Sequence, residues 1–225
     1  MLINSVWDSA TGDPLPDTTT LRAIIYGARH GFTGSGNSLD ETGSRQMAAT
    51  RDTHLAGVRF HGVYSSELPR AIESGVILGT GSTPEVQEAD PDLGYKWTQM
   101  DAALVRYAVG RPEPRDVREL LARYPPAVAC RVVIRRRIQL LLERLFNLDG
   151  PAEMLRPDLV RHLLIVSHRY AMETIVENDE GFPLLENGDI FRMEATATLP
   201  QKPPWKVQFY FGPATYLRCP IPSPC

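Results

Sequence analysis

Short apolar segments alternate with amphipathic segments along the first third of the chain. Residues 21–28 are almost continuously apolar, which is typical of a strand covered on both faces, and residues 60–65 predict a second strand. Helical spacing follows each strand, from the N-cap Asp40 to about residue 56 and over residues 67–78. Strands that alternate with helices in this way predict a parallel sheet built from right-handed crossovers.

The alternation breaks between residues 90 and 160. This stretch has no clear strand and contains several prolines, among them Pro112, Pro114, Pro125 and Pro126. Its one long helical segment repeats apolar residues at helical spacing, at Ile134, Ile138, Leu141, Leu142 and Leu145. We therefore expect residues 90–160 to form a helical insertion lying over the sheet.

The sheet pattern resumes after the insertion. Residues 161–167 predict a buried strand, and a helix should begin at about Arg169. Residues 190–195 and 205–211 are weaker strand candidates. The two ends of the chain carry no such pattern: we interpret residues up to about Thr20 as a loose leader and the proline-rich residues 219–225 as surface coil.

These elements predict one α/β domain over residues 1–225. We expect three layers, α/β/α, with a mostly parallel central sheet between the helices. The insertion at residues 90–160 should lie as a cap over the rim formed by the carboxyl ends of the strands, where open parallel sheets bind their ligands.

The composition argues against several classes of protein. The net charge of −3 argues against a dedicated nucleic-acid binder, and no apolar stretch approaches the roughly 20 residues of a membrane span. No secretory signal is visible, and the three cysteines form no CxxC pair. We expect a cytoplasmic protein with reduced thiols, no nucleic-acid partner and no membrane partner, and leave the oligomeric state open, a homodimer included.

Two of the predicted strands end in a histidine. The tripeptide Arg29-His30-Gly31 follows the first strand, and His168 directly follows the strand at residues 161–167. Arg70 lies in the first helical turn after the second strand, at the same end of the sheet. A neutral imidazole is a nucleophile toward phosphorus, and guanidinium groups fit phosphate oxygens. The sequence therefore predicts a pocket for a dianionic phosphoryl group.

Metal and nucleotide motifs are missing from the sequence. There is no HExxH, and His54, His61 and His162 lack the spacing of metal ligands. The glycines after the first strand are not followed by the Gly-Lys-Ser/Thr of a phosphate-binding loop. We expect neither a metal nor a cofactor.

Four sequence blocks together resemble the histidine phosphatase superfamily, which includes phosphoglycerate mutases and histidine acid phosphatases. The blocks are residues 29–31 (RHG), 39–43 (LDETG), 64–71 (YSSELPRA) and 166–168 (VSH), in the order and at the separations usual for that family. The resemblance implies a phosphoglycerate mutase-like fold. It also implies a metal-independent, two-step phosphoryl transfer on a small phosphorylated substrate.

The resemblance also implies roles for individual residues. His30 would attack phosphorus and become phosphohistidine, which water then hydrolyses. Arg29, Arg70 and His168 would stabilise the equatorial oxygens in the transition state, and Thr33 could add a hydrogen bond.

The proton donor for the leaving group departs from the family pattern. In the mutase-like branch the acid is a glutamate, and Tyr95 occupies that slot; in the acid-phosphatase branch it follows the second histidine, where this chain has Arg169. In the mutase-like branch the acid lies in a segment after the third strand, which the resemblance matches to residues 90–94. We favour Asp92 as the donor, with Asp90 and Glu88 as alternatives, all expected just past that strand.

A second departure follows the nucleophile. Phe32 stands where the family usually has glutamate, and the asparagine expected downstream is displaced by one position, to Asn37. The sequence thus favours a metabolite phosphatase of unusual specificity that works through phosphohistidine on His30. Two alternatives stay open: a phosphomutase or phosphotransferase, and a protein that binds phosphorylated ligands without catalysis.

Overall fold

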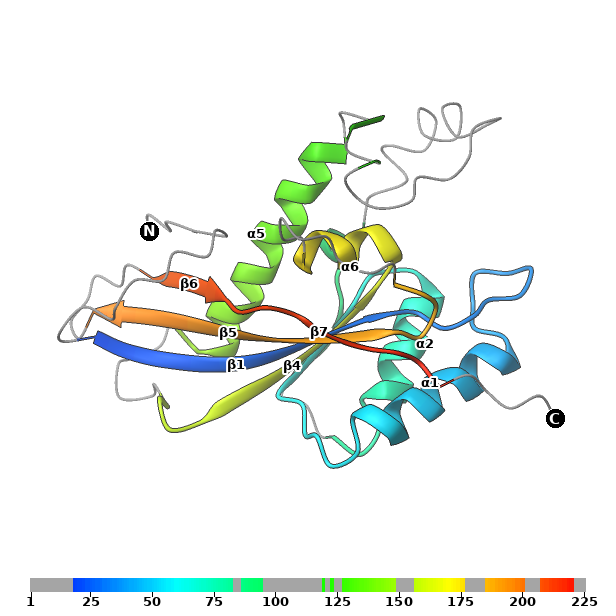
Figure 1. Cartoon of the computed structure of the whole chain (residues 1–225), viewed down its shortest axis with the longest axis horizontal. Helices are drawn as coiled ribbons and strands as arrows, with labels where there is room; N and C mark the ends of the chain where they lie inside the picture. The colour runs from blue at the N-terminus through cyan, green and yellow to red at the C-terminus, as the bar shows by residue number, and fades with distance from the viewer. Residues whose placement is uncertain are drawn as a thin grey trace.

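The computed structural model is a mixed α/β fold around one twisted sheet (Figure 1). It describes residues 18–82, 86–94, 119, 122–123, 127–148, 156–176, 185–200 and 207–220. The strands are β1 Thr18–Arg29, β2 Gly62–Ser65, β3 Val86–Ala89, β4 Val160–Ser167, β5 Ile190–Pro200, β6 Gln208–Phe211 and β7 Thr215–Leu217. The helices are α1 Glu41–His54, α2 Pro69–Leu78, α5 Ala127–Leu145 and α6 Arg169–Val176, with a 3₁₀ turn, η1, at Pro91–Leu93.

The order of the strands places the strand ends that were predicted to form the ligand-binding rim next to one another. The sheet has the order β3-β2-β4-β1-β5-β6, and β7 also pairs with β5. β1, β2, β3 and β4 are paired in parallel, whereas β5 is antiparallel to β1, β6 and β7. Among the described strands, β5 alone therefore runs against the others. In register, Arg29 lies beside Ser167 and Ser65 beside Val166, so β1, β2 and β4 end at one edge.

Different helices cover the two faces of the sheet, because successive side chains of a strand point to opposite sides. On β4, Leu163 and Ile165 belong to one hydrophobic cluster, and Leu164 and Val166 belong to the other. The first cluster includes buried residues of α5 and α6, and the second includes those of α1 and α2. In Figure 1, α5 and α6 accordingly lie above the sheet and α1 and α2 below it.

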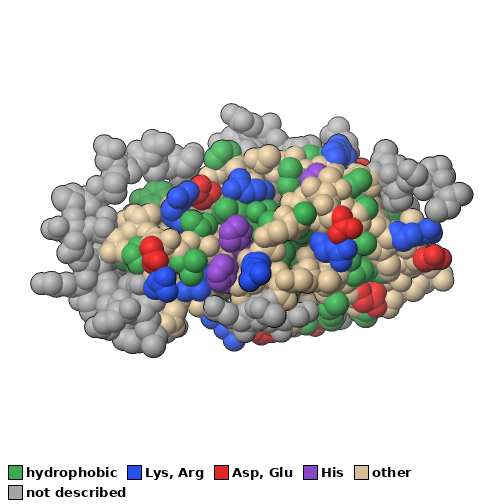
Figure 2. All heavy atoms as spheres, turned by 90° about the horizontal axis from the view of Figure 1, so that it is seen from below, with side chains coloured by type: hydrophobic (Ala, Val, Ile, Leu, Met, Phe, Trp, Pro, Cys, Tyr) green, Lys and Arg blue, Asp and Glu red, His purple; other side chains and the backbone are tan. Residues whose placement is uncertain are grey.

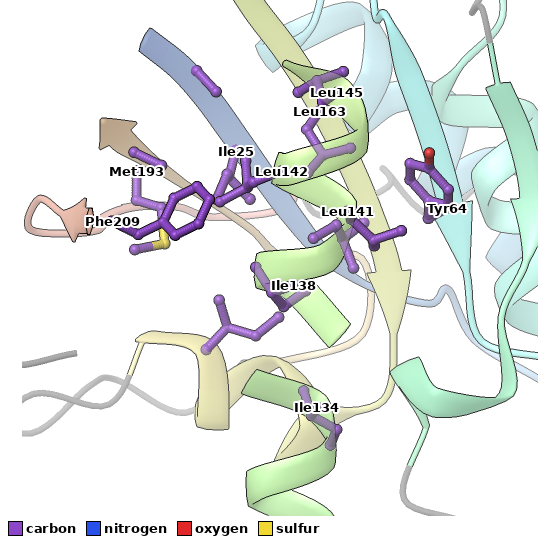
Figure 3. Close-up of a cluster of buried hydrophobic side chains, with 14 of the residues drawn as sticks. Ile25, Tyr64, Ile134, Ile138, Leu141, Leu142, Leu145, Leu163, Met193 and Phe209 are labelled. Carbon is purple, nitrogen blue, oxygen red and sulfur yellow. The ribbon is translucent and has the colours of Figure 1, made fainter. Parts of the chain in front are cut away.

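The helix α5 supplies much of the first cluster. The aliphatic residues at helical spacing are all buried, as the sequence predicts. In Figure 3, Leu141 and Leu142 lie among side chains of the sheet such as Ile25, Leu163 and Phe209, whereas Ile134 lies farther along the helix. Burying an aliphatic side chain of this size stabilises the fold by about 2 kcal/mol. Of the predicted insertion at residues 90–160, η1 and α5 are described, but Pro112, Pro114, Pro125 and Pro126 lie outside the described residues. The cap remains a prediction.

Long-range pairing extends the sheet beyond what the sequence pattern indicates. β1 begins at Thr18, which pairs with Pro200, so residues 18–20 are strand and not leader. β5 likewise continues past the predicted end at residue 195. The short strand β7 pairs with β5 and was not predicted. Each of these segments is held by its neighbour in the sheet, and such contacts leave little trace in the local pattern.

No helix among the described residues is long and apolar enough to cross a membrane.

Candidate active site

Two histidine rings meet at the edge where β1 and β4 end. His30 is the first residue after β1, and its backbone N–H donates to Ser167 O over 3.1 Å. His168 is the first residue after β4. The ring centroids of the two histidines lie 5.1 Å apart, with 65° between the ring planes. The structure thus brings together two imidazoles that are far apart in the sequence.

The hydrogen bonds of His30 define which nitrogen carries its proton. Nδ1 lies 2.8 Å from Gly31 O, and a carbonyl oxygen only accepts, so Nδ1 donates. In the neutral ring the lone pair is then on Nε2, which accepts a hydrogen bond from Arg70 Nε over 3.1 Å. His30 therefore presents Nε2 as a nucleophilic nitrogen next to a guanidinium group.

Burial keeps both imidazoles uncharged. Each histidine is only 8% exposed. Burial lowers the pKa of His30 to about 4, and the charges of Arg70 and Arg29 add to this, while the hydrogen bond to Gly31 O opposes it. Burial lowers the pKa of His168 to about 3, aided by His30, Arg70 and Arg29. Near neutral pH, the site thus combines two neutral bases with two cations, an arrangement suited to a dianion.

Arg70 is held in place by the loop that follows the nucleophile. Its backbone N–H donates to Asn37 O over 3.0 Å, and its Nη1 lies 3.4 Å from Asn37 Oδ1. Pro69 begins α2 and Arg70 is the next residue, so the guanidinium projects from the first turn of a helix at the end of β2. Burial lowers the pKa of Arg70, which is nonetheless always charged in a protein.

Arg29 approaches the histidines from the end of β1. Its Nη1 donates to Leu185 O over 2.7 Å, which ties the side chain to the segment before β5. Arg29 directly precedes His30 in the chain, and its charge contributes to lowering the pKa of both His30 and His168. The four residues expected to bind the phosphoryl group through charge or a ring nitrogen (Arg29, His30, Arg70 and His168) thus lie around one site.

Two glycines allow the loop after the nucleophile to lie directly on α1. A β-carbon at Gly43 would be 2.0 Å from Phe32 O, and one at Gly31 would be 2.8 Å from Gly43 O. The same turn of α1 is capped by Asp40, whose Oδ1 accepts from Gly43 N over 2.6 Å. This contact gives the Leu39–Gly43 block a structural role, because no other residue type fits at Gly43.

Thr33 lies in the same loop, half-buried, and its backbone forms an isolated bridge with Leu39. No hydrogen bond from its side chain to a described residue is present, so its role in binding phosphate stays a prediction. The neighbouring Phe32 is 47% exposed, although its backbone N–H is fixed by Gln46 Oε1 at 3.1 Å.

The three carboxylates proposed as proton donors differ in their surroundings. Glu88 lies inside β3, not past it, and pairs with Arg144 over 2.9 Å. Asp90 is buried, accepts from Asp92 N as the N-cap of η1, and forms an ion pair with Arg137. Asp92 is half-buried within η1. Asp90 and Glu88 form ion pairs, and although burial lowers the pKa of Arg137, all three carboxylates help to raise it, so the choice of Asp92 as the donor stays a prediction.

The turn η1 lies close to the second histidine. Ser167, the residue before His168, donates from Oγ to Leu93 O over 2.6 Å. A β-carbon at Gly94 would lie 3.6 Å from Cβ of Ser66, a residue whose hydroxyl in turn contacts His168. Tyr95, which occupies the family's usual acid slot, lies outside the described residues. Arg169 forms an ion pair with Glu173 over 3.0 Å.

Two serines at the site were missed by sequence reasoning. Ser66 Oγ lies 2.9 Å from His168 Nε2. Ser74 Oγ accepts from Gly31 N over 3.2 Å and donates to Arg70 O over 2.7 Å, so it links the nucleophile's loop to the helix of Arg70. The serine pair at the end of β2 was visible in the sequence, but nothing there showed which histidine it would meet.

The remaining histidine pair lies at the opposite ends of the strands. His61 precedes β2, and His162 is near the start of β4; their rings lie 6.2 Å apart, with 15° between the ring planes. Figure 2 shows one face of the molecule, on which charged side chains of both signs are interspersed among hydrophobic ones. In the described part of the chain, no three His, Cys, Asp or Glu side chains gather in a way that could hold a metal ion.

Comparison with known proteins identifies the family. The model of the histidine phosphatase superfamily (branch 1) matches residues 26–199, whereas no curated protein matches the chain. Among solved structures, α-ribazole phosphatase from Shigella flexneri is 20% identical, with a TM-score of 0.49 over 76% of this chain and 89% of that one. Mycobacterial glucosyl-3-phosphoglycerate phosphatase is 17% identical, with a TM-score of 0.43 over 86% and 97%. Likenesses this weak say nothing about the substrate.

Proposed function

The chain belongs to the histidine phosphatase superfamily, and we propose that it is a metal-independent phosphatase that hydrolyses a small phosphorylated metabolite through phosphohistidine on His30. One observation carries the proposal: the lone pair of His30 Nε2 lies beside Arg70 Nε and next to the ring of His168. A nucleophile, a guanidinium group and a second imidazole close to one another are the parts that phosphoryl transfer needs.

In the first step, His30 Nε2 attacks phosphorus. The P–N bond forms, the bond from phosphorus to the ester oxygen breaks, and the departing oxygen takes a proton. In the second step, water attacks the phosphohistidine, the P–N bond breaks and inorganic phosphate leaves. The lone pair returns to Nε2, and the proton that water loses restores the donor. Arg29, Arg70 and His168 stabilise the negative charge of the equatorial oxygens in both steps.

We assign the proton donor to Asp92. Protonating the departing alkoxide matters because an alkoxide is a poor leaving group in water. The hydrogen bond from Ser167 Oγ to Leu93 O holds η1 beside the residue that precedes His168, so Asp92 is on an element anchored at this rim. Asp90 already serves as a helix cap and as the partner of Arg137.

The intermediate gives the direct test of the function. Purified protein in EDTA is mixed with a panel of phosphorylated metabolites labelled with ³²P, and the reaction is quenched at alkaline pH, because phosphohistidine is acid-labile. We expect label on the peptide that contains His30 and label in inorganic phosphate. Transfer of label to an added acceptor alcohol would indicate a phosphotransferase or mutase instead. Binding of vanadate without any labelled His30 would indicate a protein that only binds phosphorylated ligands.

The pH dependence of kcat/KM follows from the buried state of His30. Its pKa of about 4 lies below the ordinary histidine value, so the nucleophile keeps its lone pair down to mildly acidic pH. After correction for the substrate's own ionisation, protonation of His30 is not expected to lower kcat/KM between pH 7 and about pH 5, and the fraction of the donor Asp92 that carries its proton shapes the other limb of the profile. Below about pH 4, kcat/KM should fall about tenfold per pH unit as His30 takes up a proton. A decrease centred near pH 6.5 would contradict this assignment.

Circular dichroism over the same range separates loss of activity from loss of structure. The pKa values of His30 and His168 are lower in the folded state than in the unfolded chain. Between about pH 6.5 and pH 4 the unfolded chain therefore binds more protons, and the free energy of unfolding falls as the pH is lowered. The kinetic profile is read only where the spectrum is still that of the folded protein.

A further inference from the structure

Ser66 is a buried hydroxyl between β2 and the second histidine. It directly follows β2, is 1% exposed, and its backbone N–H donates to Val166 O over 2.9 Å. These contacts fix its main chain against β4. Its Oγ lies 2.9 Å from Nε2 of His168. The sheet thus fixes the position of the Ser66 hydroxyl relative to the ring of His168.

Which of the two groups donates in this hydrogen bond follows from the number of partners that the Ser66 hydroxyl has. A hydroxyl has one proton, and a buried hydroxyl without an acceptor for it is costly. Within the described part of the chain, the Ser66 hydroxyl has one hydrogen-bond partner, His168 Nε2. Ser66 therefore donates, and Nε2 accepts through its lone pair. In a neutral imidazole with its lone pair on Nε2, the proton is on Nδ1.

We propose that Ser66 is a positioning residue that holds His168 as the Nδ1–H tautomer, so that this ring offers the phosphoryl group a hydrogen-bond donor. The proposal rests on the proposed function, because it takes the ligand of the site to be a phosphoryl group. With the opposite tautomer, Nδ1 would present a lone pair, which repels phosphoryl oxygens. Ser66 thus decides whether His168 attracts or repels the anion.

The same hydroxyl opposes protonation of the ring. A doubly protonated His168 would donate from Nε2, and Ser66 would then have to accept, leaving its own proton without a described partner. Among the described residues, His30, Arg70 and Arg29 act electrostatically on His168, and all three also disfavour a charged ring. The ring is thereby held as a neutral donor, in contrast to His30, whose lone pair is on Nε2 and accepts from Arg70 Nε.

The tautomer can be measured without any turnover. In protein labelled with ¹⁵N-histidine, two-bond ¹H–¹⁵N correlations report which ring nitrogen of His168 carries the proton; His168→Gln assigns the signal. We expect Nδ1–H in the wild type. In Ser66→Ala we expect the Nε2–H form to appear and the pKa of His168 to rise. An Nε2–H tautomer in the wild type would overturn the proposal whether or not Ser66→Ala folds.

Ser65→Ala is the matched control. Ser65 is the neighbouring serine, is also buried, and its Cβ faces Gly75 of α2, on the other side of the strand from His168. The Ser65→Ala substitution should leave the ¹H–¹⁵N spectrum of the histidines and the activity unchanged. Ser66→Ala should lower kcat/KM about five- to tenfold, as expected for one lost hydrogen bond, and Ser66→Thr should restore part of it.

The two proposals fail in different ways. If the wild type shows Nδ1–H and Ser66→Ala changes it, but no substrate labels His30, then the function is wrong and the role of Ser66 in fixing the ring stands. If His30 is labelled and Ser66→Ala leaves both the tautomer and kcat/KM as in the wild type, then the role of Ser66 is wrong and the function stands.

Discussion

His30→Ala is expected to release phosphate at least about four orders of magnitude more slowly than the wild type, because it removes the nitrogen proposed to attack phosphorus. Phosphate binding should survive, since Arg29 and Arg70 remain. The fold should survive as well near neutral pH, where the buried ring is uncharged and its hydrogen bonds are one to its own neighbour, Gly31 O, and one from Arg70 Nε. Phosphate release in EDTA and calorimetric titration with inorganic phosphate measure the two effects separately.

His54→Ala is the matched control for this variant. His54 is the last residue of α1, and its Nε2 lies 2.7 Å from Arg218 O at an exposed position away from the site. It removes an imidazole from the same chain without touching the proposed nucleophile. Equal rates in His30→Ala and the wild type would refute the proposed function.

Arg70→Lys is expected to lower kcat about 100- to 1,000-fold, although it keeps the formal charge. The guanidinium uses Nε toward His30 Nε2 and Nη1 toward Asn37 Oδ1, and an ammonium group cannot reproduce this fork. Losing one preorganised donor to a developing oxyanion has an effect of this size in other enzymes. A lysine is also more easily neutralised by burial than an arginine, so part of the charge itself would be lost.

Arg45→Lys provides the comparison. Arg45 lies on α1 with 53% of its side chain exposed, within 3.8 Å of Glu41, and should tolerate the change without effect on kcat. A rise in KM with kcat unchanged in Arg70→Lys would show that Arg70 binds substrate and transition state equally. That result would remove Arg70 from the groups proposed to stabilise the transition state.

The sequence predicted those parts of the fold in which local pattern and tertiary structure agree. The helix after Asp40, the helix with Pro69 in its first turn and the strand before His168 are all present. α5 was predicted from the spacing of its aliphatic residues, which are buried. These segments carry their own periodicity or caps, so a single sequence is enough to find them.

Where pairing partners decide the structure, the sequence was less informative. Thr18–Thr20 are polar and look like a leader, yet they extend β1 because β5 reaches Pro200 on the other side. At the candidate active site, too, contacts between distant residues could not be predicted. The spacing placed Arg29, His30, Arg70 and His168 at one edge of the sheet, but the contacts of Ser66 with His168 and of Asp90 with Arg137 join residues far apart in the chain. No local pattern encodes such contacts.

The position of β1 in the sheet also bears on how the chain folds. β1 is synthesised first, but its two neighbours, β4 and β5, begin only at residues 160 and 190. During synthesis this apolar segment stays unpaired until β4 and β5 have left the ribosome. Pairing at such sequence distance is slow and leaves the segment open to aggregation. We therefore expect the yield of folded protein to depend on chaperones and on the speed of translation.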